Sequence, residues 1–409
     1  MPDTVPSIVR ALIEKGVTIP APESVEIGAD VDPERISGKD VVIHAGSKIF
    51  GGKTWIGDGV QLGSEAPVTV DNCQVGPQAH LKGGYFSQTV FLQGASAGLG
   101  AHVREGTIFE EEAGIAHTVG LKQTILFPFV TLGSLINFCD CLMAGGTDRK
   151  NHSEVGSSYI HFNYTPNQDK ATPSLIGDVP RGVMLNQNPI FLGGQGGLVG
   201  PCRLDYGTVI AAGTINRKDE LRPGRLIFGG AARGGNVPYT PGVYRGEKRI
   251  ITNNIIYIGN LIALLRWYES VRSLFVSEVF PQALLEGLTE KLASGIDERI
   301  RRLGELIEKM PVSDPSGDAE ADPFRAQRKA LHACGPGLAA WLDSSRQQTG
   351  GAHFRDRFLS VLETRIQASG REYIPVIQGL APGETETGTC WLQSVVDAVV
   401  AGAQKILPF

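Results

Sequence analysis

Several common features are scarce in this sequence, and each scarcity excludes a class of protein. No run of lysine and arginine occurs, and a net charge of −5 argues against a nucleic-acid partner. No apolar stretch approaches the ~20 residues of a membrane span. The first 16 residues lack the uninterrupted apolar centre of a secretory signal. With only six cysteines in 409 residues, no oxidising compartment is indicated. We therefore expect a cytoplasmic protein with no nucleic-acid or membrane partner.

The cysteines also give little support to a metal site. Cys139 and Cys141 are close in sequence, but no second pair is present to complete a set of ligands. We therefore interpret them as structural thiols and predict no metal.

The chain does contain a six-residue rhythm, clearest between residues 190 and 215. A helix needs apolar residues at i, i+3, i+4 and i+7, and a single strand needs alternation, so this period fits neither. It fits a solenoid in which each coil has three short faces, each giving one aliphatic residue to a central core. The aliphatic residues that recur at this step are Leu192, Leu198, Leu204 and Ile210.

The rhythm is looser but detectable from about residue 24 onward, which predicts a mainly β fold, a parallel β-helix over residues 23–250. A short helix is expected within residues 1–22. Glycine-rich turns support this division, because 38 of the 52 glycines precede residue 251.

After residue 251 the apolar spacing becomes helical and predicts an α-helical domain over residues 251–409. The apolar stripe over residues 257–280 indicates bundle core, and a second helix is expected over 280–310. Residues 311–323 have the composition of a linker. Further helices are expected at 324–333, 338–347, 354–368 and 390–406.

Two segments interrupt the solenoid pattern, at residues 143–153 and 163–173. Both are polar and lack core-type residues. Loops that leave a rigid scaffold are common places for functional side chains.

Two cations lie one coil apart. Arg104 and Lys122 are separated by 18 positions, the length of three six-residue faces, so they are expected to stack on adjacent coils. Cations held ~4.8 Å apart, the spacing of paired strands, repel one another unless an anion lies between them. Arginine and lysine both bind phosphate, which makes this pair a candidate phosphate site. Asp140 lies one further step of 18 along.

Residues 104–217 resemble the acetyltransferase half of the bifunctional N-acetylglucosamine-1-phosphate uridyltransferase/glucosamine-1-phosphate acetyltransferase, which forms UDP-N-acetylglucosamine. The most specific matches are Asn163-Tyr164, the following Ile176-Gly177-Asp178, and the stretch 190–215. The resemblance implies a left-handed β-helix of hexapeptide repeats, a homotrimer with sites between subunits, and acetyl-coenzyme A as co-substrate.

The resemblance also assigns residues. The residues that it implies hold the sugar phosphate are Arg104, Lys122, Asn163, Tyr164 and Lys170. The backbone around Gly194 and Ala212 is expected to line the acetyl-coenzyme A groove, where small residues allow close approach.

The sequence departs from the family at the catalytic histidine. Counting forward from Gly133-Ser134 gives Phe138 in that position, and counting back from Asn163 gives Asp140. Our first candidate for the base is His152, since histidine titrates near neutrality. The remaining candidates are Asp140, His161 and His117.

Two further departures concern whole domains. We expect no uridyltransferase activity, because no Gly-rich nucleotide loop with a following Arg and Lys occurs near the N-terminus of this sequence, and the expected helical domain is foreign to the family. The leading hypothesis is an acyltransferase acting on an amino-sugar phosphate or nucleotide sugar. The alternatives are a binding or regulatory protein that has lost the chemistry, and a metal-dependent β-helix enzyme using His80 and His117.

Overall fold

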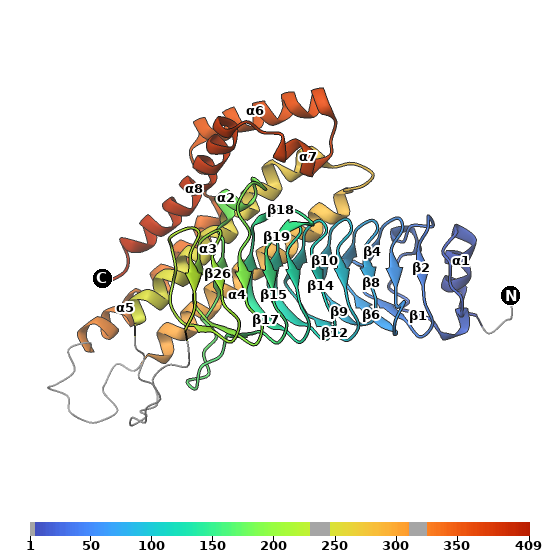
Figure 1. Ribbon diagram of the computed structural model, residues 1–409, viewed down its shortest axis with the longest axis horizontal. Coiled ribbons are helices and arrows are strands. Elements are labelled where there is room, and N and C mark those ends of the chain that lie inside the picture. Colours follow the sequence, from blue (N-terminus) through green and yellow to red (C-terminus); the bar gives the residue numbers. More distant parts are fainter. Residues whose placement is uncertain (1–4, 230–245, 311–324) are drawn as a thin grey trace.

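The computed structural model describes residues 5–229, 246–310 and 325–409, and the linker expected at 311–323 lies outside these ranges. The chain forms a parallel β-solenoid of about 11 turns followed by an α-helical region, as the sequence predicts. The solenoid core is built as the six-residue rhythm requires, because Leu192, Leu198, Leu204 and Ile210 are all buried. Figure 1 shows the coils stacked along one axis, with the helices crossing them obliquely.

The strands form three faces, which we number in the order the chain visits them. Face 1 comprises β1 (Glu26–Ile27), β3 (Lys48–Phe50), β6 (Val68–Asp71), β9 (Gly84–Ser87), β12 (Ala101–Val103), the start of β15 (Gly120–Leu126) and of β17 (Asn137–Met143), β21 (Ile160–Phe162), β24 (Gly197–Val199) and β27 (Ile215–Asn216). Face 2 comprises β4 (Trp55–Ile56), β7 (Gln74–Val75), β10 (Thr89–Phe91), β13 (Thr107–Phe109), the ends of β15 and β17, β22 (Ser174–Ile176) and β25 (Arg203–Leu204).

Face 3 is a separate parallel sheet. It comprises β2 (Val42–Ile43), β5 (Gln61–Leu62), β8 (His80–Leu81), β11 (Ser96–Ala97), β14 (Gly114–Ile115), β16 (Thr131–Leu132), β20 (Glu154–Val155), β23 (Phe191–Leu192), β26 (Val209–Ile210) and β28 (Leu226–Ile227). The two excursions expected from the sequence leave at different corners. Residues 143–153 include the hairpin of β18 (Gly146–Asp148) and β19 (Asn151–His152), between faces 2 and 3. Residues 163–173 form a loop between β21 on face 1 and β22 on face 2.

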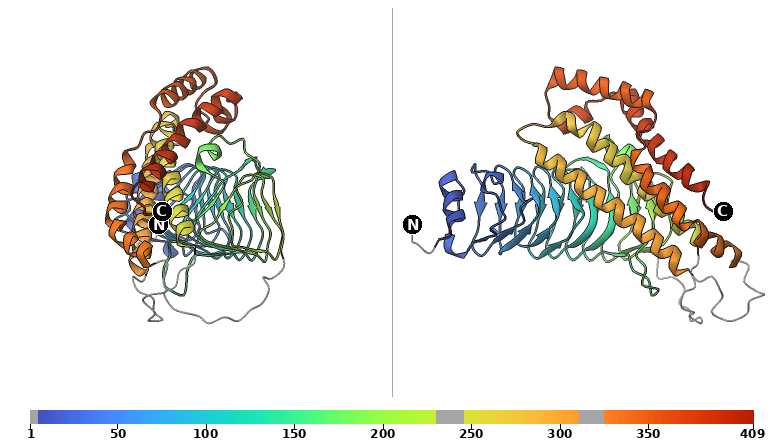
Figure 2. Two further views of the ribbon diagram at one scale, coloured as in Figure 1. Left: turned by 90° about the vertical axis from the view of Figure 1, so that its left-hand side faces the viewer. Right: turned by 180° about the vertical axis from the view of Figure 1, so that it is seen from behind.

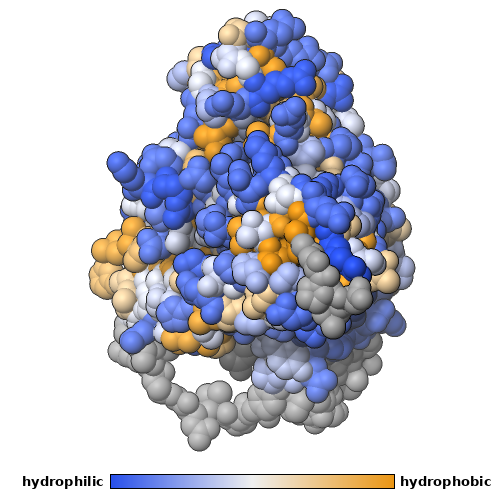
Figure 3. All heavy atoms as spheres, turned by 90° about the vertical axis from the view of Figure 1, so that its right-hand side faces the viewer, coloured by the Kyte–Doolittle hydropathy of each residue, from blue (hydrophilic) through white to orange (hydrophobic). Residues whose placement is uncertain are grey.

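The N-terminal end of the solenoid is covered by α1 (Ser7–Lys15), the helix expected there. Its Val9 and Leu12 are buried, and Gly16 ends the helix in the left-handed conformation with φ of 114°. Seen from this end, the surface is largely hydrophilic, with smaller apolar areas between the polar ones (Figure 3). The helix therefore shields the apolar core at its open end.

The helical region lies against one side of the solenoid and leaves the opposite side uncovered (Figure 2). Its helices, and the short α2 within the solenoid, are α2 (Val179–Gly182), α3 (Glu247–Ser270), α4 (Gln282–Lys309), α5 (Arg325–Ser344), α6 (Ala352–Ser369), α7 (Tyr373–Gln378) and α8 (Pro382–Gln404). The segment Glu247–Phe275 is long and apolar enough to cross a membrane, but 78% of its most apolar window is buried in the bundle. We interpret it as the bundle core that the stripe over 257–280 predicts.

One helix prediction is wrong. Two helices were expected at 324–333 and 338–347, but a single helix, α5, continues through Pro336. A proline inside a helix removes one main-chain hydrogen bond. Burial of Leu331, Leu338 and Leu342 on both sides of the proline holds the two halves in one helix.

Helix α4 runs along face 2 and contacts successive coils, because it packs against β7, β10 and β13. Near its start, Glu290 forms an ion pair with Lys53 at 3.0 Å. A Cβ on Gly287 would lie 2.6 Å from Gln74 Oε1, so a larger residue here would require the Gln74 side chain to shift. Further along the helix, Gly295 and Arg299 reach the corner between faces 1 and 2.

Candidate functional site

The corner between faces 1 and 2 carries the stacked cations. Val103 pairs with Leu121, and the Arg104 amide donates to the Leu121 carbonyl at 2.9 Å, so Arg104 and Lys122 occupy equivalent positions on adjacent coils. The stacking expected from their spacing is confirmed. Lys122 is not free, because its Nζ lies 2.5 Å from Glu105 Oε1. Burial acts to raise the pKa of Glu105, but the hydrogen bond and charge of Lys122 hold it below its ordinary value.

The next predicted step, from Lys122 to Asp140, is wrong. Lys122 pairs with Cys139, because the corner at Gln123 is one residue shorter than the corner at Gly106 and the coil has 17 residues. Asp140 therefore stacks on Gln123 of the preceding coil. Both have positive φ, 63° for Asp140 and 50° for Gln123. Such a backbone is unusual for residues other than glycine and marks a tight turn.

Asp140 is nearly enclosed at this corner. Its side chain is 5% exposed, with Oδ1 2.7 Å from Arg299 Nη2 of α4. Its Oδ2 accepts a hydrogen bond from Asn163 Nδ2 at 3.1 Å. Because both carboxylate oxygens are engaged, Asp140 is poorly placed to take a proton from a substrate.

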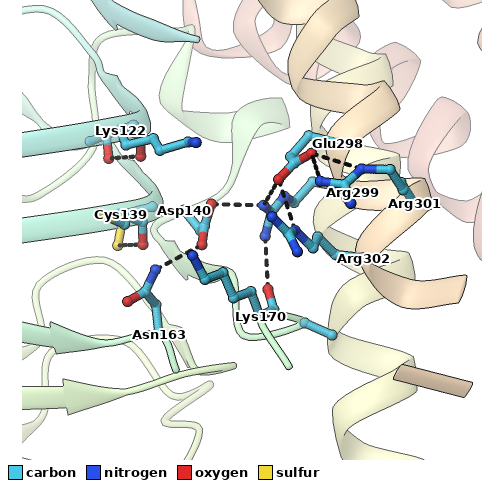
Figure 4. Close-up of polar contacts among 12 residues, drawn as sticks. Lys122, Cys139, Asp140, Asn163, Lys170, Glu298, Arg299, Arg301 and Arg302 are labelled. Atoms are coloured by element: carbon cyan, nitrogen blue, oxygen red, sulfur yellow. Dashed lines mark hydrogen bonds and ion pairs between the residues drawn. The ribbon is translucent and has the colours of Figure 1, made fainter. Parts of the chain in front are cut away.

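A cavity of about 440 Å³ opens at this corner, between the solenoid and α4. It brings together all five residues implied to hold the sugar phosphate, and Asp140 lines it as well. Figure 4 shows three of the five, Lys122, Asn163 and Lys170, beside Asp140. The full lining is Arg104, Lys122, Asn137, Cys139, Asp140, Asn163, Tyr164, Lys170, Glu298, Arg299 and Arg302. Five of these side chains are cationic and two are acidic, so the cavity has the charge expected of an anion site.

Helix α4 supplies the residues that the sequence analysis missed. Arg302 Nε donates to Glu298 at 2.8 Å, Arg301 also contacts Glu298, and Arg299 joins this network through Glu298 at 3.8 Å (Figure 4). A signal for Arg299 was present in the sequence. Arg299 lies three residues after Ile296 and four before Leu303, so it falls on the apolar stripe of the helix, where an arginine needs a buried partner.

Tyr164 and Lys170 stand on the loop over residues 163–173. The Tyr164 side chain is exposed, and Lys170 Nζ lies 5.8 Å from its ring centroid. The loop is also bonded within itself, since the Gln168 amide donates to the Thr165 carbonyl at 2.9 Å.

His152 lies elsewhere. It ends the β18–β19 hairpin at the corner between faces 2 and 3, with Nε2 3.8 Å from Glu154 and a side chain 16% exposed. It does not line the cavity. The nearby Gln378 of α7 donates to the Thr147 carbonyl at 2.5 Å, so the hairpin packs against the helical region.

The other histidine candidates have structural partners. His161 is buried in the solenoid, where its Nδ1 donates to the Cys139 carbonyl at 2.7 Å and Ser174 Oγ lies 2.8 Å from Nε2. Burial lowers the pKa of His161 to about 4, so it is neutral at neutral pH. His117 Nδ1 lies 2.8 Å from Ser134 Oγ at the corner between faces 3 and 1. Phe138 is fully buried in the core.

Gly194 and Ala212 lie at the corner between faces 3 and 1, on adjacent coils. This corner is tightly stacked, since a Cβ on the neighbouring Gly193 would lie 2.3 Å from the Ala212 nitrogen. Thus the predicted phosphate residues, the predicted base and the predicted acetyl-coenzyme A residues occupy three different corners of the solenoid.

A metal centre has little support in the part of the chain that the structure describes. Within residues 5–229, 246–310 and 325–409, no group of three or more His, Cys, Asp or Glu side chains is arranged to hold a metal ion. Cys139 and Cys141 are both buried and unbridged.

Sequence comparison gives relatives of the solenoid. The chain is 29% identical over 211 residues to the bifunctional protein GlmU of Pelobacter propionicus, covering 51% of this chain and 40% of that protein. It is 26% identical over 212 residues to the bifunctional protein GlmU of Thermotoga petrophila, covering 52% and 42%. No family model matches the chain.

The solenoid is like the hexapeptide-repeat acetyltransferase domain of GlmU. The chain spans about two fifths of the length of these GlmU relatives.

Proposed function

We propose that the protein is an acetyl-coenzyme A-dependent acyltransferase acting on an amino-sugar phosphate or nucleotide sugar. The observation that carries the proposal is the cavity at the corner between faces 1 and 2, where Arg104, Lys122, Asn163, Tyr164 and Lys170 meet. Arg104 and Lys122 hold the phosphate, and the amide and ring of the Asn163-Tyr164 pair contact the sugar. The likeness to GlmU supports the same assignment and a cytoplasmic location.

In the reaction, the amine or hydroxyl of the acceptor attacks the thioester carbonyl carbon. The carbon–sulfur bond breaks, coenzyme A leaves as the thiol, and the acceptor loses one proton. The protein contributes by positioning the two substrates, and the open main chain near Gly194 and Ala212 faces the acyl donor.

The proposed assembly is a homotrimer. Within one subunit the donor and acceptor residues lie at different corners, so a neighbouring copy is needed to bring them together. Faces 1 and 3 carry exposed apolar residues in register, which suits burial against another copy. On face 1 these are Ile160 and Ile215, and on face 3 they are Phe191, Val209 and Leu226.

His152 stays the proposed base only if the assembly brings the hairpin of one subunit to the cavity of another. His152→Ala then lowers turnover by about 10²–10⁴-fold with nearly unchanged acceptor affinity. An unchanged rate removes His152 from the mechanism.

A second function is favoured by one observation: none of the cavity's lining residues is a histidine, and Asp140 is engaged by Arg299 and Asn163. A sugar-phosphate or nucleotide-sugar binding protein needs no base.

The test that separates the two functions follows coenzyme A thiol release from acetyl-coenzyme A. Glucosamine-1-phosphate and a small panel of amino-sugar nucleotides serve as acceptors, and calorimetry measures their binding in parallel. Turnover with one acceptor supports the transferase, and a thermal shift with acetyl-coenzyme A supports its donor site. Binding of an acceptor without turnover and without that shift supports the binding protein.

A further inference from the structure

Side chains of the helical region donate hydrogen bonds to main-chain carbonyl groups of the loop over residues 163–173. Lys309 Nζ of α4 donates to the Gln168 carbonyl at 2.6 Å, and Arg299 Nη1 donates to the Lys170 carbonyl at 3.3 Å. From α3, Asn254 Nδ2 donates to the Ala171 carbonyl at 2.8 Å. Three side chains from two helices thus bond carbonyl groups within four consecutive residues of one loop.

The same loop presents side chains to the cavity. Asn163, Tyr164 and Lys170 all line it, and the loop forms no strand between β21 and β22. A loop without ladder hydrogen bonds keeps one conformation only if other contacts fix it. The bonds from α3 and α4 supply such contacts.

Arg299 connects both sides of the cavity. Its guanidinium bonds Asp140 through Nη2 and the Lys170 carbonyl through Nη1. Asp140 in turn accepts from Asn163. One buried arginine therefore orients Asn163 through Asp140 and Lys170 through the loop backbone, as Figure 4 shows.

We propose that α3 and α4 hold this loop in its ligand-binding conformation, with Arg299, Lys309 and Asn254 as positioning residues for the sugar phosphate. The inference rests on the proposed function, and it gives the helical region a role in acceptor affinity. The acyl-donor residues Gly194 and Ala212 lie at another corner and are independent of these bonds.

Lys309→Ala is the test. Lys309 is the exposed last residue of α4, so its substitution leaves the buried ion pair between Arg299 and Asp140 intact. Lys15→Ala is the matched control. Lys15 is also a last-turn helix lysine, and it donates to the carbonyl of Pro33 at 3.0 Å, far from the cavity. Lys309→Arg keeps the positive donor and should restore the wild-type behaviour.

Three measurements are made on the full chain. Trypsin cleavage of the Lys170–Ala171 bond, followed by mass spectrometry, reports loop order. Calorimetry gives the Kd for glucosamine-1-phosphate, and steady-state kinetics separates KM from kcat. We expect Lys309→Ala to speed the cleavage and to weaken binding by about three- to tenfold, the value of one hydrogen bond. KM should rise by a similar factor with kcat unchanged, and the acetyl-coenzyme A thermal shift should not move.

The outcomes separate this inference from the proposed function. If the wild-type protein binds neither glucosamine-1-phosphate nor an amino-sugar nucleotide, the proposed function is wrong and the loop positions no such ligand. If the wild type binds, and Lys309→Ala loosens the loop without changing Kd, only the positioning role is wrong. Unchanged cleavage and unchanged Kd contradict it as well.

Discussion

Glu105 competes with the ligand for Lys122, and this competition predicts an increase in affinity from a single substitution. Lys122 lies 2.5 Å from Glu105, whereas no ion pair joins Arg104 to a carboxylate in the described part of the chain. A phosphate entering the cavity must draw Lys122 from its direct ion pair with Glu105, whereas Glu105 acts on Arg104 only through its charge. Glu105→Gln should therefore strengthen phosphate binding, and Arg104→Ala should weaken it more than Lys122→Ala does.

The magnitudes follow from the exposure of the pair. The Lys122 and Glu105 side chains are 27% and 41% exposed, so their ion pair is worth about 0.2–1 kcal/mol. Removing the competitor should lower Kd by the same free energy, a factor of about 1.5–5. Loss of Arg104, a charge-assisted donor, should cost about 1.5–3 kcal/mol of binding. The cost for Lys122→Ala should be smaller by the free energy of the pair.

Calorimetric titration of glucosamine-1-phosphate into the three variants checks this order. Glu65→Gln is the control, since Glu65 forms a comparable ion pair with Lys82 at 3.0 Å, with both side chains nearly half exposed. An equal loss for Arg104→Ala and Lys122→Ala, together with an unchanged Kd for Glu105→Gln, would refute the reasoning. An increase in affinity for Glu65→Gln would show that net charge alone is responsible.

Three further predictions concern stability and assembly. Arg299→Met leaves the buried carboxylate of Asp140 without its ion-pair partner and should destabilise the protein by about 3–5 kcal/mol. Adding Asp140→Asn removes the unpaired charge and should recover much of the loss, which thermal melts of the single and double variants check. Burial, followed by the charge of Glu111, raises the pKa of Glu110 from 4.5 to about 7. The folded protein therefore favours the protonated form of Glu110, and this stabilisation is fully present below pH 4.5 and is lost as the pH rises through 7. Glu110→Gln should then be more stable than the wild type at pH 8 by about 3 kcal/mol, with the difference vanishing below pH 5 in melts across pH. Light scattering at micromolar concentration should return the mass of a trimer, and a monomer mass would contradict a site shared between subunits.

The solenoid was predictable because its rule is local. A residue every six positions fills the core, so Leu192 and Leu198 could be placed without knowing any distant contact. The stacking of Arg104 on Lys122 followed from the same rule. The prediction that Asp140 stacks on Lys122 was wrong because the corner at Gln123 is one residue shorter, while the six-residue rhythm of the flanking strands is unchanged.

The helical wall of the cavity was not predictable in the same way. Lys309 bonds a carbonyl 141 residues earlier in the chain, and nothing near it in sequence marks that contact. Arg299 could have been flagged as a charge on an apolar stripe, but its partner could not be chosen among many carboxylates. Contacts of this kind depend on how two differently built regions pack, which no local period encodes.

Helix α4 also fixes how many coils the solenoid has beside it. It crosses the coils obliquely, and successive coils are ~4.8 Å apart, so it meets them one after another along its length. The helix meets Lys53 through Glu290, Asp140 through Arg299 and the Gln168 carbonyl through Lys309. Deleting one coil between the first and last of these contacts would move the remaining coils by ~4.8 Å relative to the helix, so these side chains could not all keep their partners. Coils in this stretch are therefore not interchangeable units, although repeat proteins usually gain and lose them freely, and the length of the solenoid here is set by the helix beside it.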